Sequence, residues 1–331
     1  MNGPESRTAA EPRRSPALSI VVPNYNHGQL IGEALGAIAG QTVAPFEVIV
    51  VDDGSTDDSV ARIRALARDM PLQVHCHPKN RGVVAAMNTG LSLVKGDFVL
   101  FSAADDRLAR QTVELAAAAA AEFPATGIIF SDHAEMSADG SETRVMPLDF
   151  PAARRHFSGR DFIALMQRSF FGFHVSSVWF NVGLLRALGG FRAELRWHCD
   201  LFVTYAAAFD RGATYVPGAI AYFRQLPTSY GTAGSRSAAQ VDVLRAWLAA
   251  TREPGREATR AAFVTAAILP EYSHRAMRAL RSDPGYLTFR LFRRLVWLSF
   301  WMKMAPFVST RARTWARNIR SRYRKARLGM G

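Results

Sequence analysis

Residues 46–60 read FEVIVVDDGSTDDSV, and this stretch decides the fold. Its first part, Glu47–Asp52 (EVIVVD), is short, apolar and rich in β-branched residues, which is typical of a buried strand. Its second part changes abruptly to acidic and small polar residues, which are typical of a turn that leads into a helix. In open α/β sheets, ligands bind just beyond the carboxyl ends of parallel strands. The stretch therefore predicts both an α/β sheet and a ligand-binding edge on it.

Outward from this stretch, strand-like and helix-like segments alternate through the first 130 residues. This alternation predicts an α/β fold with a predominantly parallel, helix-covered sheet. The predicted strands are Leu18–Pro23, Glu47–Asp52, Gln73–His77, Phe98–Ser102 and Gly127–Ser131. The predicted helices between them are Gln29–Ala39, Ser59–Arg68, Val83–Val94 and Arg110–Glu122.

Polar residues follow three of the predicted strands. The first strand runs into Pro23-Asn24-Tyr25, the second into Asp52-Asp53 and the fourth into Asp105-Asp106. Carboxylates gathered at one edge repel one another unless a cation or hydrogen-bond donors offset their charge, so a divalent metal with a phosphate ligand explains them economically. Neither G-x-G-x-x-G nor G-x-x-x-x-G-K-[ST] occurs in the sequence, which excludes the two common glycine-rich phosphate loops.

These polar residues also have purely structural interpretations. Ser55 or Thr56 would cap the helix after the second strand, and Asp105 and Asp106 would cap the helix after the fourth. The run His75-Cys76-His77 resembles a metal cluster by composition, but neighbours in a strand point to opposite faces. No other Cys or His pair stands at a useful spacing, so this run is interpreted as part of a strand.

Five linked motifs resemble glycosyltransferase family 2, whose members are inverting enzymes with a GT-A fold. They read SIVVPNYNHGQLIGEALGAIAGQT from Ser19, FEVIVVDDGSTDDSV from Phe46, NRGVVAAMNTGL from Asn80, KGDFVLFSAADD from Lys95 and LGGFRAELRWHCDLFVTYAAAFDRGATYVPGAIAYF from Leu188. The resemblance covers residues 17–225 in the family's order and approximate spacing. We therefore predict a GT-A domain over 17–225, a disordered leader at 1–16 and a helical, basic region at 226–331.

The resemblance implies a nucleotide site. Pro23, Asn24 and Tyr25 would border the nucleotide, Asp52 would accept a hydrogen bond from its base, and Asp53 would shape the turn beside it. Three further residues, which follow the third strand, match a segment that also lies near the nucleotide: Asn80, Gly82 and Asn88.

The resemblance also implies a metal site and a catalytic base. Asp105, with Asp106 beside it, matches the acid that holds Mg²⁺ or Mn²⁺ on the sugar diphosphate, and Asp200 matches the base that takes the acceptor proton. Two residues depart from the family pattern. The first acid of the D-x-D motif is replaced by Ala103, which weakens the expected metal affinity, and Cys199 stands before the base where Glu is common. Asp200 would also favour a helix dipole as a purely structural residue.

The excess of positive over negative charge lies almost entirely at one end of the chain. The net charge is +13 and the pI about 10.5, yet residues 281–331 hold 13 Lys and Arg against the single acid Asp283. Helices are predicted over 237–250, 256–280 and 286–304, with another beyond Pro306. Basic residues beside Trp297 and Trp301 are typical of a helix in an anionic membrane surface. The alternative is a pair of helices packed on the body with a solvated basic face.

We therefore predict an inverting glycosyltransferase that transfers sugar from a nucleotide sugar, a UDP-sugar, to a glycan or lipid-linked acceptor. Two cysteines, and a start that does not resemble a signal peptide, predict a cytoplasmic protein at the inner face of the membrane. Two alternatives remain open: a non-catalytic nucleotide-sugar-binding protein, because of Ala103, and a sugar-phosphate nucleotidyltransferase. The segregated charge argues against a nucleic-acid partner.

Overall fold

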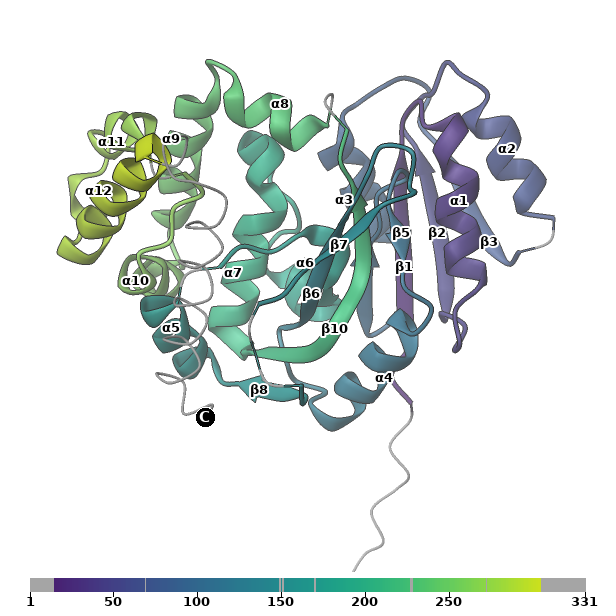
Figure 1. Ribbon diagram of the computed structural model, residues 1–331, viewed down its shortest axis with the longest axis horizontal. Coiled ribbons are helices and arrows are strands. Elements are labelled where there is room, and N and C mark those ends of the chain that lie inside the picture. Colours follow the sequence, from purple (N-terminus) through teal and green to yellow (C-terminus); the bar gives the residue numbers. More distant parts are fainter. Residues whose placement is uncertain are drawn as a thin grey trace, which may run out of the picture.

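The computed structural model describes residues 15–304, apart from 69, 149, 151, 170, 227–228, 272 and the side chains of 298–304. One mixed sheet with strand order β3-β2-β1-β4-β9-β6-β10-β5 forms its centre, with β7 beside β6 and β8 beside β10 (Figure 1). The first four strands in this order are parallel. β9 runs antiparallel between β4 and β6, and β10 is parallel to β6. The predicted α/β fold with a predominantly parallel sheet is confirmed.

The strands lie close to their predicted positions in the first half of the chain. Their bounds are β1 Leu18–Asn24, β2 Glu47–Asp52, β3 Leu72–Cys76, β4 Phe98–Phe101, β5 Arg107–Leu108, β6 Ile128–Met136, β7 Thr143–Met146, β8 Arg155–Phe157, β9 Val178–Asn181 and β10 Ala213–Arg224. The helices of this half are α1 Gly28–Ala39, α2 Ser59–Leu66, α3 Val83–Leu93 and α4 Thr112–Glu122.

Two apolar layers enclose the N-terminal half of the sheet. Ile20 and Val50 lie in the layer that packs against α1, α2 and α4, whereas Val21 and Ile49 lie in the layer that packs against α3. Adjacent strand residues enter opposite layers because side chains alternate across a strand. Burial on both faces explains why EVIVVD is continuously apolar rather than alternating.

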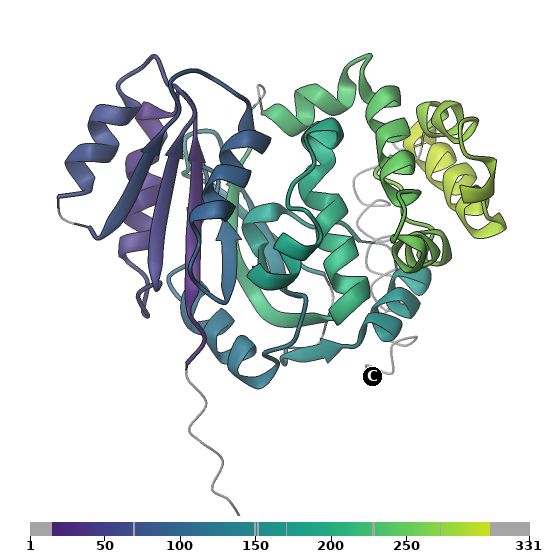
Figure 2. The same ribbon diagram turned by 180° about the vertical axis from the view of Figure 1, so that it is seen from behind.

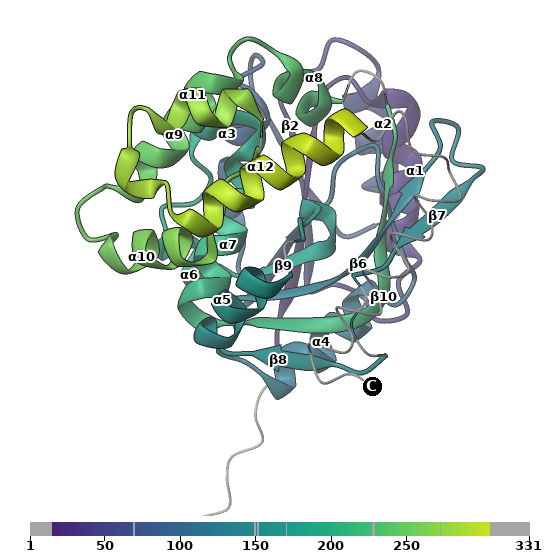
Figure 3. The same cartoon turned by 60° about the vertical axis from the view of Figure 1, so that its left-hand side comes forward.

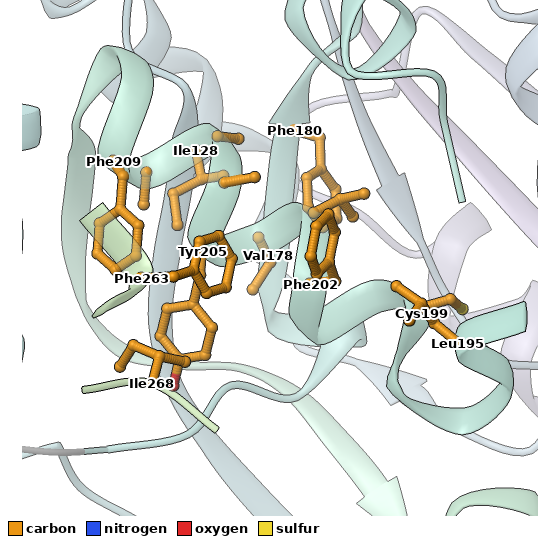
Figure 4. Packing of buried hydrophobic residues seen from close by; sticks show 14 of the residues in the cluster. Ile128, Val178, Phe180, Leu195, Cys199, Phe202, Tyr205, Phe209, Phe263 and Ile268 are labelled. Carbon is orange, nitrogen blue, oxygen red and sulfur yellow. The ribbon is translucent and has the colours of Figure 1, made fainter. Parts of the chain in front are cut away.

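The C-terminal half continues through α5 Gly159–Arg168, η1 Val175–Ser177, α6 Val182–Ala187, η2 Ala193–His198 and α7 Cys199–Arg211. Helix α7 is the centre of its packing. Phe202, Tyr205 and Phe209 lie on its inner side, and Phe209 contacts Phe263 with ring centroids 5.4 Å apart (Figure 4). The contact between Phe209 and Phe263 holds α7 against α10, Glu257–Ala266.

The remaining helices are α8 Tyr230–Arg236, α9 Gln240–Thr251, α10 Glu257–Ala266, α11 His274–Leu280 and, after η3 Pro284–Tyr286, α12 Phe289–Met304. A single helix over 256–280 was predicted, and this is wrong. The backbone of Ala267 turns left-handed at φ 55°, and Pro270 follows three residues later, so the helix ends at Ala266. The predicted leader up to residue 14 and the predicted helix beyond Pro306 lie outside the described residues.

Within the described part of the chain, no helix has both the length and the apolar character needed to cross a membrane.

Candidate active site

The carboxyl ends of β1 and β2 bring Asn24 and Asp52 side by side. The two residues are paired in the parallel register, and both arrows point to the end of the molecule where α8 lies (Figure 2). Asn24 Nδ2 donates to Asp52 Oδ2 at 2.7 Å. The structure thus places these two predicted nucleotide residues in direct contact.

Asp52 organises the turn after β2. Its carboxylate is 1% exposed and accepts hydrogen bonds from Ser55 N at 2.9 Å and Ser55 Oγ at 2.7 Å, besides the one from Asn24. A carboxylate offers about four acceptor positions, so about one remains for a ligand. The predicted capping role of Ser55 is wrong, because α2 begins at Ser59 and Asp57, not Ser55, accepts from its first amide.

Asn24 carries a buried acceptor that fits a ligand donor. Its Oδ1 atom has no hydrogen-bond partner among the described residues. A buried amide oxygen without a partner is unfavourable, so a donor such as an imide N–H or a ribose hydroxyl would stabilise it. The neighbouring Tyr25 is 40% exposed, and Pro23 is half-buried.

Asp53 is engaged by the protein itself, in keeping with the turn-shaping role that the resemblance implies. It is buried, its Oδ1 lies 2.6 Å from His77 Nδ1, and its two oxygens accept from Arg81 N at 2.9 Å and Gly82 N at 2.7 Å. All of these partners belong to the protein. Asp53 therefore shapes the loop between β3 and α3, and His77 is a structural residue, as the interpretation of His75-Cys76-His77 predicted.

The residues predicted after the third strand divide between the loop and the core. Asn80 is exposed, and its Oδ1 accepts from Gly82 N at 2.9 Å. Gly82 has φ 91°, a conformation that favours glycine, and leads into α3. Asn88 is engaged elsewhere: its amide donates to Phe191 O at 2.7 Å and accepts from Phe191 N at 2.9 Å. Its amide therefore links α3 to the segment before α7, and the residue also lines the pocket at the start of α3, so its nucleotide contact stays a prediction.

The loop after β4 presents Asp105 and buries Asp106. Asp106 Oδ2 accepts from Ser176 Oγ at 2.5 Å and Oδ1 from Arg224 N at 3.0 Å. Burial, with the nearby charge of Asp105 second, raises the pKa of Asp106 to about 7. The prediction that Asp106 holds a metal is wrong, because both of its carboxylate oxygens accept hydrogen bonds from other residues of the protein. The prediction that it caps a helix is also wrong, because the next element is the strand β5.

Asp105 keeps the predicted position for a metal ligand. Its side chain is half-buried, and neither carboxylate oxygen forms a hydrogen bond within the described part of the chain. Over the same residues, no group of three His, Cys, Asp or Glu side chains is arranged to hold a metal. One available carboxylate suits a divalent ion that takes its remaining ligands from substrate phosphates and water. The residues present thus fit such an ion only if the nucleotide sugar supplies part of its ligands.

Arg224 fixes the loop that carries Asp105, and the sequence reasoning missed it. Its guanidinium donates to Asp105 O at 2.9 Å and Ala138 O at 2.9 Å, and it pairs with Glu33 Oε2 at 2.5 Å. The side chain is buried at the end of β10. A charged residue that closes the apolar run of β10 was the available signal, since buried arginines are nearly always paired.

Asp200 lies in the first turn of α7, where the predicted base belongs. Its Oδ1 accepts from Leu201 N at 2.8 Å, and within the described part of the chain its side chain has no other hydrogen bond. Burial raises its pKa to about 6, so the carboxyl titrates near neutral pH as a general base should. Cys199 packs into the core beside Leu195 (Figure 4).

The segment before Asp200 is held by groups that the sequence reasoning also missed. Gln240 accepts from Trp197 Nε1 at 2.7 Å, and its Nε2 lies 3.0 Å from His198 Nε2. Arg196 has φ 46°, an uncommon conformation for a residue with a side chain. Tyr230 of α8 packs against Trp197 with ring centroids 6.0 Å apart.

A pocket of about 500 Å³ lies between the start of α3 and α8. Arg81, Gly82 and Val83 line one side, and Tyr230 and Ala193 line the other. The segment before Asp200 thus lies across this pocket from the loop that carries Asn80.

The sequence model of Glycosyl transferase family 2 matches residues 19–180. Nearly half of the chain is therefore similar to this family. The matched segment holds Asn24, Asp52 and Asp105, while Asp200 lies beyond it. This match confirms the family predicted from the five motifs.

Curated relatives share the first part of the chain. An uncharacterized glycosyltransferase of Haemophilus influenzae is 33% identical over 100 residues, which are 30% of this chain and 40% of that protein. A PGL/p-HBAD biosynthesis glycosyltransferase of Mycobacterium tuberculosis is 32% identical over 120 residues, 36% of this chain and 47% of that protein. The chain therefore spans less than half the length of these relatives.

Solved structures support the fold. S. aureus TarS in complex with UDP-GlcNAc matches with a TM-score of 0.61 at 21% identity, over 81% of this chain and 73% of that one. The mannosyltransferase PcManGT from Pyrobaculum calidifontis, in complex with GDP-Man and Mn²⁺, matches with a TM-score of 0.55 at 22% identity, over 97% and 88%. At this identity the likeness shows a shared fold.

Proposed function

We propose that this protein transfers a sugar from a nucleotide sugar to an acceptor hydroxyl with inversion of the anomeric configuration. One observation carries the proposal: in a chain similar to family 2, the Asn24 and Asp52 pair and the available carboxylate of Asp105 follow strands that end at one edge of the sheet. Asp200, at the start of α7, supplies an acid whose pKa of about 6 suits a base near neutral pH.

The chemistry follows from the roles of these residues. Asp200 takes the proton of the acceptor hydroxyl, whose oxygen forms a bond to the anomeric carbon. The bond from that carbon to the phosphate oxygen breaks on the opposite face, and the nucleoside diphosphate leaves. Mg²⁺ or Mn²⁺, held by Asp105 and the donor phosphates, would neutralise the charge that builds on the leaving group. A positioned general base typically contributes about 10²- to 10⁴-fold to the rate.

The donor we propose is a UDP-sugar. Asn24 Oδ1 and the remaining acceptor position of Asp52 suit the imide N–H of a pyrimidine base. TarS is named in complex with UDP-GlcNAc and PcManGT with GDP-Man, so nucleoside diphosphate sugars as a class are supported by the shared fold.

We propose a glycan or lipid-linked acceptor, and a location at the inner face of the membrane through the basic region at 226–331. The domain bounds 17–225 and 226–331 are part of this proposal. The excess of positive charge in residues 281–331 supports the membrane location.

A thermal-shift screen of nucleotide sugars, with and without Mn²⁺, tests the donor proposal. A specific ligand raises the unfolding temperature by mass action. We expect one UDP-sugar with Mn²⁺ to stabilise the protein most, and a much smaller effect without the ion. Equal, small shifts for all nucleotide sugars would contradict a donor site.

Ala103 favours a second candidate, a non-catalytic protein that binds nucleotide sugars. It places a methyl group where the family has its first D-x-D acid. The two candidates differ in one readout: stabilisation by a nucleotide sugar without any release of nucleoside diphosphate would favour the binding protein.

A further inference from the structure

Helix α12 is docked on the helical region by one of its sides. Leu291 and Leu295, one helical turn apart, are buried. Between them Arg294 donates to Ala267 O and Met166 O, each at 2.8 Å, and so satisfies carbonyls at the ends of α10 and α5. These contacts fix which side of α12 faces outward.

The opposite side of α12 is apolar and exposed. Figure 3 shows the helix crossing the front of the molecule, with α11 above it and α10 below it in this view. Phe289 is 76% exposed, Phe292 45% and Val296 54%. These residues follow the i, i+3 and i+7 spacing of one helix face. We call this set, with the exposed cations Arg290 and Arg293 beside it, the outer face of α12.

We propose that the outer face of α12 lies in the surface of an anionic membrane, with its apolar side chains among the acyl chains and its arginines at the headgroups. A helix with apolar residues on one side and flanking cations is the pattern of an interfacial helix. The positive charge of residues 281–331, which hold 13 basic residues and one acid, favours lipids with anionic headgroups. Each cation near an anionic surface adds to the attraction.

The same charges disfavour the other occupants of this face. A second copy would bring an identical basic region, and like charges placed against each other weaken association. A nucleic acid would satisfy Arg290 and Arg293 but would leave Val296 and the apolar edges of both phenylalanines against a polyanion. An anionic bilayer satisfies both kinds of side chain at once.

Neighbouring elements add further exposed charge of the same sign. Arg290 Nη1 donates to Gln167 O at 3.3 Å, which sets the start of α12 against the end of α5. The next residue of α5, Arg168, is exposed. The basic border of the outer face therefore extends onto α5.

This inference rests on the membrane association proposed above and is independent of the transfer reaction. Its test is co-sedimentation of the full chain with vesicles of phosphatidylglycerol and phosphatidylcholine in equal parts, and with vesicles of phosphatidylcholine alone. We expect binding to the anionic vesicles only. Phe292→Asp and Phe289→Asp should each weaken this binding roughly tenfold or more, because each replaces an aromatic ring that would lie among the acyl chains with a charged carboxylate.

Matched controls separate the face from general effects. Phe46→Asp makes the same change at an exposed phenylalanine before β2, and should leave vesicle binding unchanged. Arg293→Glu should weaken binding, whereas Arg64→Glu, the same charge change at an exposed position of α2, should not. Thermal unfolding and the donor-induced shift of each variant verify that the fold and the donor site are intact.

Three results would overturn the proposal. The first is unchanged vesicle binding of both α12 phenylalanine variants. The second is an equal loss in the Phe46→Asp control. The third is a protein dimer or an RNA complex that both α12 variants abolish while vesicle binding persists. If no nucleotide sugar raises the unfolding temperature of the parent protein, this result would instead count against the transferase proposal alone.

Discussion

Asp200 combines a half-buried carboxyl with a pKa of about 6, and the proposed reaction needs its ionised form. We expect kcat/KM to fall as the pH drops below about 6, because the protonated acid cannot accept a proton. Asp200→Asn should reduce transfer by about 10²-fold or more with little change in donor binding. A pH–rate profile of both proteins measures this, and a variant with near-normal turnover would rule out Asp200 as the base.

The same raised pKa predicts a stability change of defined sign. The folded state holds its proton up to about pH 6, whereas an unfolded Asp releases it near 3.8. The folded protein therefore binds more protons in this window, and its stability falls as the pH rises through it. Asp200→Asn should accordingly raise the unfolding temperature more at pH 8 than at pH 4. An equal change at both pH values would contradict the burial of this charge.

Asp105 and Asp106 are neighbours with different roles, and substitution separates them. Asp105→Ala should abolish metal-dependent transfer, because no second carboxylate is available in the described loop. Asp106→Asn should be mild, since an amide can accept from Arg224 N and donate to Ser176 Oγ. Asp106→Ala should destabilise the fold by about 1–3 kcal/mol through unsatisfied buried groups.

A Mn²⁺ titration of activity at fixed donor, with urea unfolding of each variant, measures these effects. Ala103→Asp is the matched gain-of-function variant, and it should tighten Mn²⁺ binding if a second acid reaches the ion. Full metal-dependent activity in Asp105→Ala would refute the metal assignment.

At this scale, the sequence indicated where polar residues gather but not what each one binds. Asn24, Asp52 and Asp105 lie where the motifs predict. Asp53 and Asn88 look equally like ligand-binding residues in the sequence, yet their partners are backbone groups of the loop before α3 and of Phe191. A motif marks the need for a polar side chain, and only the three-dimensional structure tells whether that need comes from a ligand or from the chain.

Helix α8 is held on the segment before Asp200 by a close approach at Gly234. A Cβ atom at this position would lie 2.2 Å from Trp197 Cε3, whereas one at Gly231 of the same helix would meet nothing within 4 Å. Gly234→Ala should therefore displace α8 or Trp197, costing about 1–3 kcal/mol and lowering transfer. Gly231→Ala should be neutral or slightly stabilising. Urea unfolding and kcat/KM of both variants measure this, and equal behaviour would contradict the packing.

At the level of elements, the strongly patterned segments are predictable and the rest of the sheet is not. Strands β1 to β4 and helices α1 to α4 lie within a few residues of their predicted bounds. Strands β9 and β10 were not predicted, because short apolar runs do not distinguish a strand from a buried helix. The break between α10 and α11 depends on the backbone of Ala267, although Pro270 was a visible signal.

On the scale of the whole molecule, the basic region is partly structural. Tyr286, Leu291 and Leu295 are buried, and Asp283 pairs with Arg260 at 2.7 Å. Truncation after residue 281 should therefore destabilise the protein by several kcal/mol, since each buried side chain contributes about 1.5–3 kcal/mol. Truncation after residue 304 removes none of these contacts and should leave the unfolding temperature nearly unchanged. Thermal unfolding of the two truncated chains measures this, and equal stability would contradict the docking of α12.

The central claim is that this protein activates a nucleotide sugar with Asp105 and deprotonates the acceptor with Asp200. Its most direct test is release of nucleoside diphosphate, with water as acceptor, from the nucleotide sugar that stabilises the protein most. We predict Mn²⁺-dependent release by the parent, none by Asp105→Ala, and about 10²-fold slower release by Asp200→Asn at unchanged donor affinity. Release by either variant at the parent rate, or release by the parent that a chelator leaves unchanged, would contradict the account.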